Sequence, residues 1–464
     1  MIERIEPLGP LVNECSLPGE SKADGVFPSH ANGVPLSRNR WLLTYATRGY
    51  RFGDDDWSVV YQIRDGSPVG RVIKEGYLSR AHGEWDPFGD GTRYFRQHGH
   101  PVTFGVPKGA LVKGKRVSHE NVFVAKWRVL GIAIHEPGGW KGWDKPWPRR
   151  DPRTQAVEWM QFRLNDREDD IEILQPARQL RQKGAEQGGV IGFTRTGEPL
   201  EQMNQTFVQA VPFNDDCSEW ADVNHFPGGR IAPMKYRFNP RAKLYEWVET
   251  APLIASRNPR VSLYEASLIR FRDEFIIMAR KTILPLEKKP LQPETAAGRQ
   301  DLDLDEIGAA WARSDDPFGK APELVYPTSP NCYNVPLTAF LCADGVIRLF
   351  GGDASLSLPP RGRRNPLRCW DIDPVTFAAS NQRVVFDAFD YGLPIKRSAD
   401  KPEWTPALDF GKLLAHMGGR EQYIVHRCHL NRNENAWAGV YHEKIVYAED
   451  YAPTWTFGAE GVAE

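Results

Sequence analysis

The chain has 464 residues, of which 41% are apolar and 26% charged, with a formal net charge of -1. This balance is that of a soluble globular protein, and it offers no global basic field for nucleic acid. The N-terminal stretch MIERIEPLGPLVNE lacks the basic and apolar regions of a signal peptide, and no apolar run reaches the length of a membrane span. We therefore expect a cytoplasmic protein without nucleic-acid or membrane partners, or a secreted or periplasmic one if a signal peptide was removed.

Strand–turn–strand units recur along the chain, each with Gly, Asn, Asp or Pro at its turn. Such residues supply the local hydrogen bonds and positive φ angles that hairpins need. Two runs show helical periodicity instead, residues 175–183 and 301–313. The predicted hairpins cover residues 41–64, 234–249, 267–280, 337–350 and 422–442.

A weak internal repeat links three of these units. His30-Ala-Asn-Gly-Val-Pro-Leu and Asn331-Cys-Tyr-Asn-Val-Pro-Leu each precede an apolar strand, and His100-Pro-Val-Thr leads more loosely into another. A hairpin-sized unit repeated through an all-β chain indicates a β-propeller. At about 60–65 residues per unit we expect seven blades of four-stranded antiparallel sheets. The prediction is one domain over residues 1–464, with loop insertions near 138–190 and 285–325.

The repeat also predicts where polar residues gather. In a propeller the innermost strand of every blade starts at the same mouth of the central channel. If the repeat marks those starts, four polar residues converge at one mouth: His30, Asn32, His100 and Asn334.

Residues 96–127 gather three histidines, His98, His100 and His119. Three interpretations stay open: a metal site, a polar loop, and a proton-transfer site, because histidine titrates near neutrality. Pro101 indicates a turn, and no carboxylate stands at ligand spacing, which weakens the metal interpretation.

Metal and cofactor chemistry find little support elsewhere. The six cysteines form no C-x-x-C pair, and the cluster from His426 to His429 offers too few ligands for a zinc site. We predict no catalytic metal and no required cofactor. A structural divalent cation held by backbone carbonyls is left open.

Tyr264 and Arg280 stand at the two ends of one predicted hairpin whose turn lies near Asp273. The two side chains are therefore expected side by side. A guanidinium next to a phenol favours the phenolate and lowers the pKa of the tyrosine. An ordinary cross-strand cation–π pair explains the spacing equally well.

Two histidines a hairpin apart, followed by a Tyr and an Arg a hairpin apart, resemble the β-propeller polysaccharide lyases, the ulvan lyases and rhamnose-α-1,4-glucuronate lyases. These families lie within the sialidase-like propellers with BNR repeats. The resemblance implies a lyase that cleaves the bond to a uronic acid, glucuronate linked to rhamnose, by β-elimination. It assigns catalysis to His100, His119, Tyr264 and Arg280. We further predict that His30, Asn32, Arg48 and Asn334 bind the substrate.

Two other functions stay open. A sialidase-like glycoside hydrolase would use Tyr264 with Glu265 and Arg280, an acid from the run Asp54 to Asp56, and another arginine, either Arg48 or Arg51. The Ser-x-Asp-x-Gly-x-x-Trp boxes of sialidases are absent from this sequence. A non-catalytic propeller that binds a glycan is the third reading. In each case the expected partner is an oligo- or polysaccharide, and for the lyase it contains uronate.

Overall fold

The structure is a computed structural model. It describes residues 1–49, 56–86, 89, 91, 93–112, 115–116, 121–133, 150–180, 190–191, 200–202, 205–214, 229–257, 261–283, 309–327, 329–330, 332, 335–353, 364–393, 406–430 and 437–457. Within these ranges nearly all regular structure is antiparallel β-sheet, and no helix is long and apolar enough to cross a membrane.

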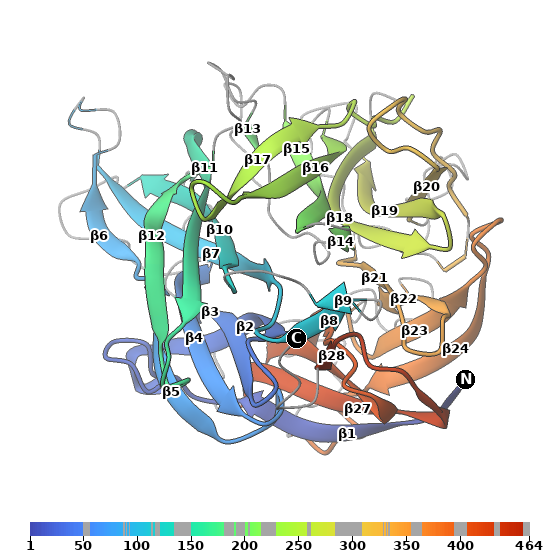
Figure 1. Cartoon of the computed structure of the whole chain (residues 1–464), viewed down its shortest axis with the longest axis horizontal. Helices are drawn as coiled ribbons and strands as arrows, with labels where there is room; N and C mark the ends of the chain where they lie inside the picture. The colour runs from blue at the N-terminus through green and yellow to red at the C-terminus, as the bar shows by residue number, and fades with distance from the viewer. Residues whose placement is uncertain are drawn as a thin grey trace, which may run out of the picture.

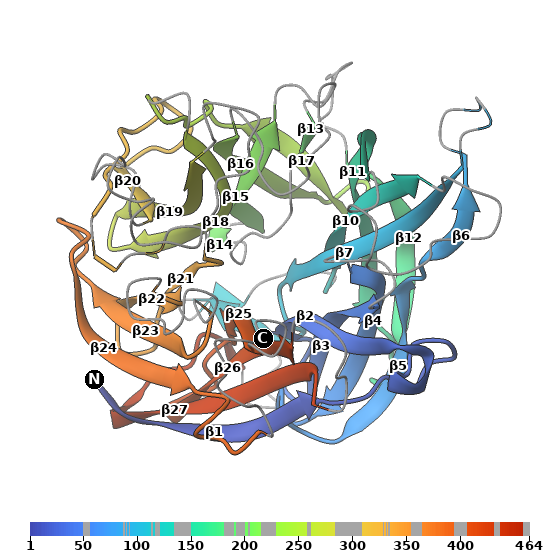
Figure 2. The same cartoon turned by 180° about the vertical axis from the view of Figure 1, so that it is seen from behind.

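The sheets are arranged as blades around a central axis (Figures 1 and 2). From the centre outward, the first blade comprises β2 (Val26–Pro35), β3 (Arg40–Gly49), β4 (Asp56–Asp65) and β5 (Val72–Ser79). The second comprises β7 (Tyr94–Gly105), β10 (Phe123–Ala133), β11 (Arg150–Leu164) and β12 (Ile171–Gln179), with β6 (His82–Trp85) on the other edge of β7. The third comprises β13 (Val190–Ile191) and β14 (Leu200–Gln202), both paired with β15 (Thr206–Asn214), then β16 (Arg230–Asn239) and β17 (Leu244–Thr250).

The remaining blades follow the same order. The fourth comprises β18 (Val261–Phe271), β19 (Glu274–Ile283) and β20 (Ala310–Ser314). The fifth comprises β21 (Thr338–Leu341), β22 (Ile347–Gly351), β23 (Leu367–Ile372) and β24 (Ala379–Phe386). The sixth comprises β25 (Pro406–Leu413), β26 (Gly419–Leu430), β27 (Gly439–Tyr451) and, as its outermost strand, β1 (Ile2–Val12).

The propeller prediction is confirmed, but the blade number is wrong. The described residues form six blades, not seven. The error came from the assumed length per unit, since 464 residues over six blades is about 77 each. The second blade alone runs from residue 82 to 179 and inserts the short strands β8 (Ala110–Val112) and β9 (Lys115–Arg116) between its first two long strands.

The predicted hairpins all form antiparallel pairs: β3–β4, β16–β17, β18–β19, β21–β22 and β26–β27. The predicted helix over 175–183 is wrong, because residues 175–179 belong to β12, the exposed outer strand of the second blade. Of the run 301–313, residues 310–313 lie in β20, and 301–308 lie outside the described residues. The predicted single domain and its two insertions stay predictions.

The ring closes by pairing the first strand with the last blade. β1 runs antiparallel to β27 over most of its length, so the two ends of the chain complete one sheet (Figure 1). Gly9 permits this closure, because its φ is +98° and a Cβ there would stand 2.3 Å from the Tyr391 hydroxyl oxygen. Only a glycine fits both constraints at this position.

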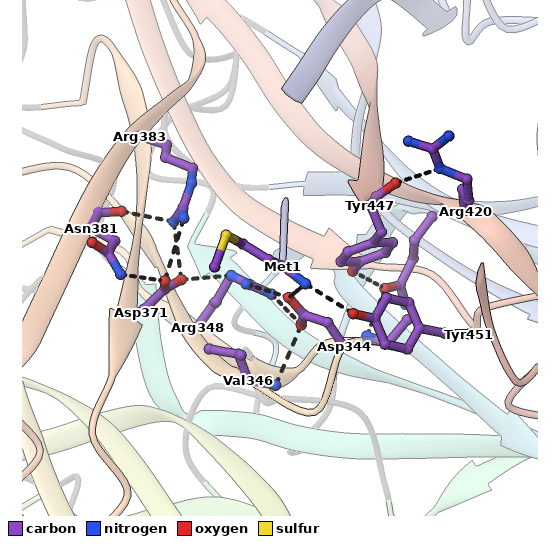
Figure 3. A network of polar contacts seen from close by, with 12 residues as sticks. Met1, Asp344, Val346, Arg348, Asp371, Asn381, Arg383, Arg420, Tyr447 and Tyr451 are labelled. Atoms are coloured by element: carbon purple, nitrogen blue, oxygen red, sulfur yellow. Dashed lines mark hydrogen bonds and ion pairs between the residues drawn. The ribbon is translucent and has the colours of Figure 1, made fainter. Parts of the chain in front are cut away.

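A buried ionic network ties the start of β1 to the fifth blade (Figure 3). Arg348 donates two hydrogen bonds of 2.6 Å to Asp344 and a third, from Nε, to Asp371 at 2.7 Å. The Met1 amino group lies 3.2 Å from the same Asp344 carboxylate. Burial works to raise the pKa of Asp344, but the Arg348 contacts outweigh it and lower that pKa. The network therefore holds the β21–β22 turn against the closing strand.

A small three-stranded sheet, separate from the blades, crosses one face of the ring. β28 (Thr456–Phe457) pairs with β8, which pairs with β9, and Figure 1 shows this sheet lying over the middle of the propeller. The C-terminal segment thus covers the end of the channel where the innermost strands finish. The predicted site residues do not lie at the starts of the innermost strands, as expected from the repeat: His30 and His100 lie near the middle of β2 and β7, away from this covered end.

Candidate active site

Four innermost strands carry the same irregularity at the same height. In β2, β7, β18 and β25, two consecutive residues lie opposite a single residue of the second strand. Such β-bulges bend a strand and re-aim its side chains, and they are over-represented next to active sites. The paired bulge residues are 30 and 31, 100 and 101, 265 and 266, and 410 and 411.

Three of these bulges place a residue other than glycine in the left-handed region. The φ angles are +43° at His30, +53° at His100 and +51° at Glu265. A side chain in this region costs about 1–3 kcal/mol, and such residues cluster at functional sites. The same position in three blades therefore holds a strained polar residue, which marks this height of the channel as the candidate site.

The two histidines of these bulges are in contact. The His30 and His100 ring centroids are 4.2 Å apart, with an angle of 57° between the planes. The Ser29 hydroxyl lies 3.0 Å from His30 Nδ1. Both rings are less than a tenth exposed. Two imidazoles this close disfavour double protonation, because like charges repel.

The third bulge builds a Tyr–Glu–Arg cluster. Tyr264 and Arg280 are direct cross-strand partners, and the guanidinium carbon lies 4.7 Å from the centre of the Tyr264 ring. Arg280 Nη1 donates a 2.7 Å hydrogen bond to Glu265 Oε2. The side chains of this ion pair are only 5% and 2% exposed. The predicted Tyr264–Arg280 contact is thus present, and Glu265 fixes the guanidinium beside the phenol.

In three blades an arginine occupies the same position on the second strand. It is the cross-strand partner of the residue just before the bulge. Arg128 faces Gly99, Arg280 faces Tyr264, and Arg427 faces Asp409 in the register of the second strands. All three arginines are buried. In the first blade Ala46 takes this place, and Arg48 follows two residues later on the same face. Several buried cations at one height favour an anionic ligand.

Two further predicted residues have structural partners. The Asn32 side-chain oxygen accepts a 3.1 Å hydrogen bond from the Thr103 backbone N–H, which links the first and second blades directly below their bulges. His98 lies on the same strand as His100, but its Nδ1 is 3.0 Å from the Ser79 hydroxyl. Asn32 therefore positions His30 relative to His100, and His98 packs against the first blade.

His119 and Asn334 lie outside the described residues, as do Asp54 and Asp55 of the acidic run. The structure brings together His30 with His100, and Tyr264 with Arg280. Among the described residues no group of three or more His, Cys, Asp or Glu side chains could hold a metal ion.

The sequence interpretation missed Arg128 and Arg427. A signal for them exists, since Trp127-Arg128, Ala279-Arg280 and His426-Arg427 are three second-strand pairs ending in arginine. Aligning them requires the bulge positions, which depend on strand register and not on local residue preference.

A buried lysine lies two residues before Arg128. Lys126 is fully buried, its Nζ donates a 2.9 Å hydrogen bond to the Tyr236 hydroxyl, and it lies over the Tyr236 ring. Burial lowers the pKa of Lys126 to about 7. This amine connects the second and third blades rather than the bulges.

Comparison with known proteins identifies the fold. No protein-family model matches the chain, and no curated protein matches it in sequence. Among solved structures, a protein of unknown function from Dyadobacter fermentans is 12% identical and matches 96% of this chain and 100% of its own, with a TM-score of 0.53. The chain is a β-propeller. A Trypanosoma rangeli sialidase is 12% identical over 90% of this chain and 54% of its own, at a TM-score of 0.48.

An α-L-arabinofuranosidase variant from Fusarium graminearum, solved with an iminosugar inhibitor, is 11% identical over 95% of this propeller and 98% of its own chain, at a TM-score of 0.43. The propeller spans about half the length of the sialidase. At these identities the likeness concerns the fold alone.

Proposed function

We propose that this propeller is a polysaccharide lyase that cleaves a glycosidic bond to a uronic acid, glucuronate linked to rhamnose, by β-elimination. The observation that carries the proposal is the shared bulge. It sets a histidine pair and a Tyr264–Arg280 pair at one height of the same channel, each on a strained or bulged strand. These are the group types that proton abstraction next to a carboxylate requires.

Arg280 has the role of neutralising the uronate carboxylate. The C5 proton of a uronate is weakly acidic while the adjacent carboxylate carries its charge. A guanidinium on that carboxylate stabilises the enolate-like intermediate in which the charge is spread. Glu265 holds Arg280 in place through the buried ion pair. The Glu265 carboxylate also weakens the binding of the unreacted substrate carboxylate to Arg280. Arg280 therefore contributes more to stabilising the intermediate than to binding the substrate.

Tyr264 and His100 form the acid–base pair. One removes the C5 proton, the C4–O4 bond breaks as the C4–C5 double bond forms, and the other protonates the departing O4 oxygen. Atoms balance without water or a redox cofactor. His30 is in ring contact with His100 and so helps to hold that imidazole in position.

A second candidate is hydrolysis of an acidic sugar by a sialidase-like mechanism. Three observations favour it: the adjacency of Tyr264 and Glu265, the pairing of Glu265 with Arg280, and the three buried arginines in equivalent register. In this mechanism Tyr264 attacks the anomeric carbon as the glycosidic bond breaks and the departing oxygen takes up a proton. Water then attacks the same carbon, which releases the sugar and restores the Tyr264 phenol.

One assay separates these functions. The protein is incubated with ulvan, gum arabic and other glucuronate polymers while absorbance near 235 nm, from the unsaturated uronate, and new reducing ends are followed together. The lyase gives both signals. Reducing ends without the absorbance reject elimination and establish hydrolysis. Binding without either signal establishes a non-catalytic glycan-binding propeller.

The assay has a matched pair of variants. Tyr264→Phe removes the phenol and keeps the cation–π contact, and we expect turnover to fall by at least about a hundredfold, as for loss of a general acid–base group. His98→Gln changes a histidine of the same strand that packs against Ser79, and we expect it to leave turnover unchanged. Full activity in Tyr264→Phe contradicts the assigned role.

A further inference from the structure

A cavity lies in the channel beyond the bulges, toward the ends of the innermost strands. Its volume is about 480 Å³, within the range of about 300–1,000 Å³ that small-molecule sites occupy. It is lined by residues that follow the bulges by three to five positions, 33–35 in β2, 103–105 in β7 and 268–270 in β18. His30, His100 and Tyr264 are not among its lining residues. This exit cavity is therefore distinct from the candidate active site.

The walls of the exit cavity are mainly apolar. Phe104, Leu268 and Leu414 come from the innermost strands and the segment after β25, and Trp455 comes from the C-terminal segment that crosses the channel. Four further polar residues line it, and each is engaged: Gln422 with Leu414 and Tyr447, Thr103 with Thr44, Thr454 with the His416 backbone N–H, and the exposed Arg270 with the Arg272 carbonyl oxygen. A strongly polar ligand such as a sugar would find few partners here.

His416 is the exception in this wall. It is 2% exposed, and its Nδ1 lies 2.9 Å from the Ala452 carbonyl oxygen, which only accepts hydrogen bonds. Nδ1 therefore carries the proton, and in the neutral ring Nε2 is left as an acceptor. Within the part of the chain that is described, this buried Nε2 has no hydrogen-bond partner. A buried acceptor without a partner is unfavourable, and a hydrogen-bond donor that enters the cavity would satisfy it.

We propose that the exit cavity binds a small, largely apolar molecule with one hydroxyl group, an aromatic or aliphatic alcohol, whose hydroxyl donates to His416 Nε2. The apolar walls bury the body of the ligand, and the histidine fixes its orientation. Leu341, 41% exposed, lines the cavity at its solvent side and marks the way in, beside the end of β21. The proposal does not depend on the chemistry of the bulges.

Titration calorimetry with phenol, toluene and benzoate on the full chain tests it. We expect phenol to bind about tenfold more tightly than toluene, the worth of one hydrogen bond. In His416→Phe we expect this preference to disappear while toluene still binds. Tighter binding of benzoate than of phenol, through Arg270 or through a donating Nε2, would overturn the proposal, as would the absence of binding by all three probes.

A second variant guards against a folding effect. His416→Phe also removes the contact to Ala452, so loss of binding alone could reflect a displaced C-terminal segment. Ala415→Trp fills the half-buried edge of the cavity and leaves His416 unchanged. We expect it to abolish binding of phenol and toluene with an unchanged thermal midpoint. Wild-type affinity for phenol in Ala415→Trp would place the ligand elsewhere and overturn the proposal.

Discussion

At the scale of single residues, the strained histidines are the sharpest feature of the molecule. His100 keeps φ at +53° in a bulge where glycine would be relaxed. His100→Gly should therefore leave the free energy of unfolding unchanged or raised, while turnover on the uronate polymer falls by about a hundredfold or more. Urea unfolding and initial rates measured on the same preparation check this. A stable and fully active His100→Gly would remove the histidine from the mechanism.

The buried ion pair makes a second prediction at this scale. Glu265→Gln removes the negative charge that pairs with the buried Arg280 guanidinium, which should cost about 3–5 kcal/mol of stability. In the double variant Glu265→Gln with Arg280→Gln the loss should be smaller than the sum of the two single losses. Denaturant unfolding of all four proteins gives the coupling energy. Additive losses would show that the pair does not act as a unit.

The sequence predicts Tyr264 beside Arg280 because a hairpin with a central turn makes its two ends partners. It also links His30 to His100 through a repeated motif, and their rings are in contact. Arg128 and Arg427 could not be found this way, since their equivalence to Arg280 appears only when the bulges fix the register.

At the scale of elements, β10 carries a buried amine whose protonation opposes folding. The pKa of Lys126 falls to about 7 in the folded protein, from an ordinary value of 10.5. Between about pH 7 and 10 the unfolded chain holds this proton and the folded chain does not, so this residue makes stability rise with pH across that window.

Replacing the amine should remove that dependence. Lys126→Met should stabilise the protein at pH 7 and gain less at pH 9.5. At the higher pH the folded wild-type lysine is already neutral and the unfolded chain has begun to lose the same proton, so the remaining penalty for burying it is smaller. Urea unfolding at the two pH values measures the difference, with the exposed Lys108→Met as control. An equal gain at both pH values would contradict a neutral Lys126.

The hairpins could be predicted because the residues that form a turn are neighbours in the sequence. The helix predicted over 175–183 was wrong because residues 175–179 form an outer strand. Residues 175–179 of β12 are mostly exposed, so no alternation of buried and exposed residues marks them as a strand.

At the scale of the whole molecule, closure of the ring depends on Gly9 of β1. Gly9→Ala should lose about 1–3 kcal/mol, because alanine at φ +98° is strained and its Cβ would overlap the Tyr391 hydroxyl. Adding Tyr391→Phe removes the nearest atom and should recover part of the loss. Gly19→Ala is the matched control, since Gly19 has φ +79° and no neighbour within 4 Å. Equal losses in both alanine variants, measured by urea unfolding, would show that the contact with Tyr391 has no effect.

The number of blades could not be predicted from the sequence. A repeat of hairpins identifies a propeller, but the count depends on how much chain each blade inserts, as β8 and β9 do in the second blade. These insertions carry no periodicity of their own.

The most direct measurement is a crystal structure of Tyr264→Phe with an unreacted oligosaccharide of alternating rhamnose and glucuronate. The account predicts a sugar ring at the height of the bulges, its carboxylate within hydrogen-bond distance of Arg280 and its C5 and O4 facing His100. An oligosaccharide bound with its carboxylate away from Arg280, or bound outside the channel, would contradict it.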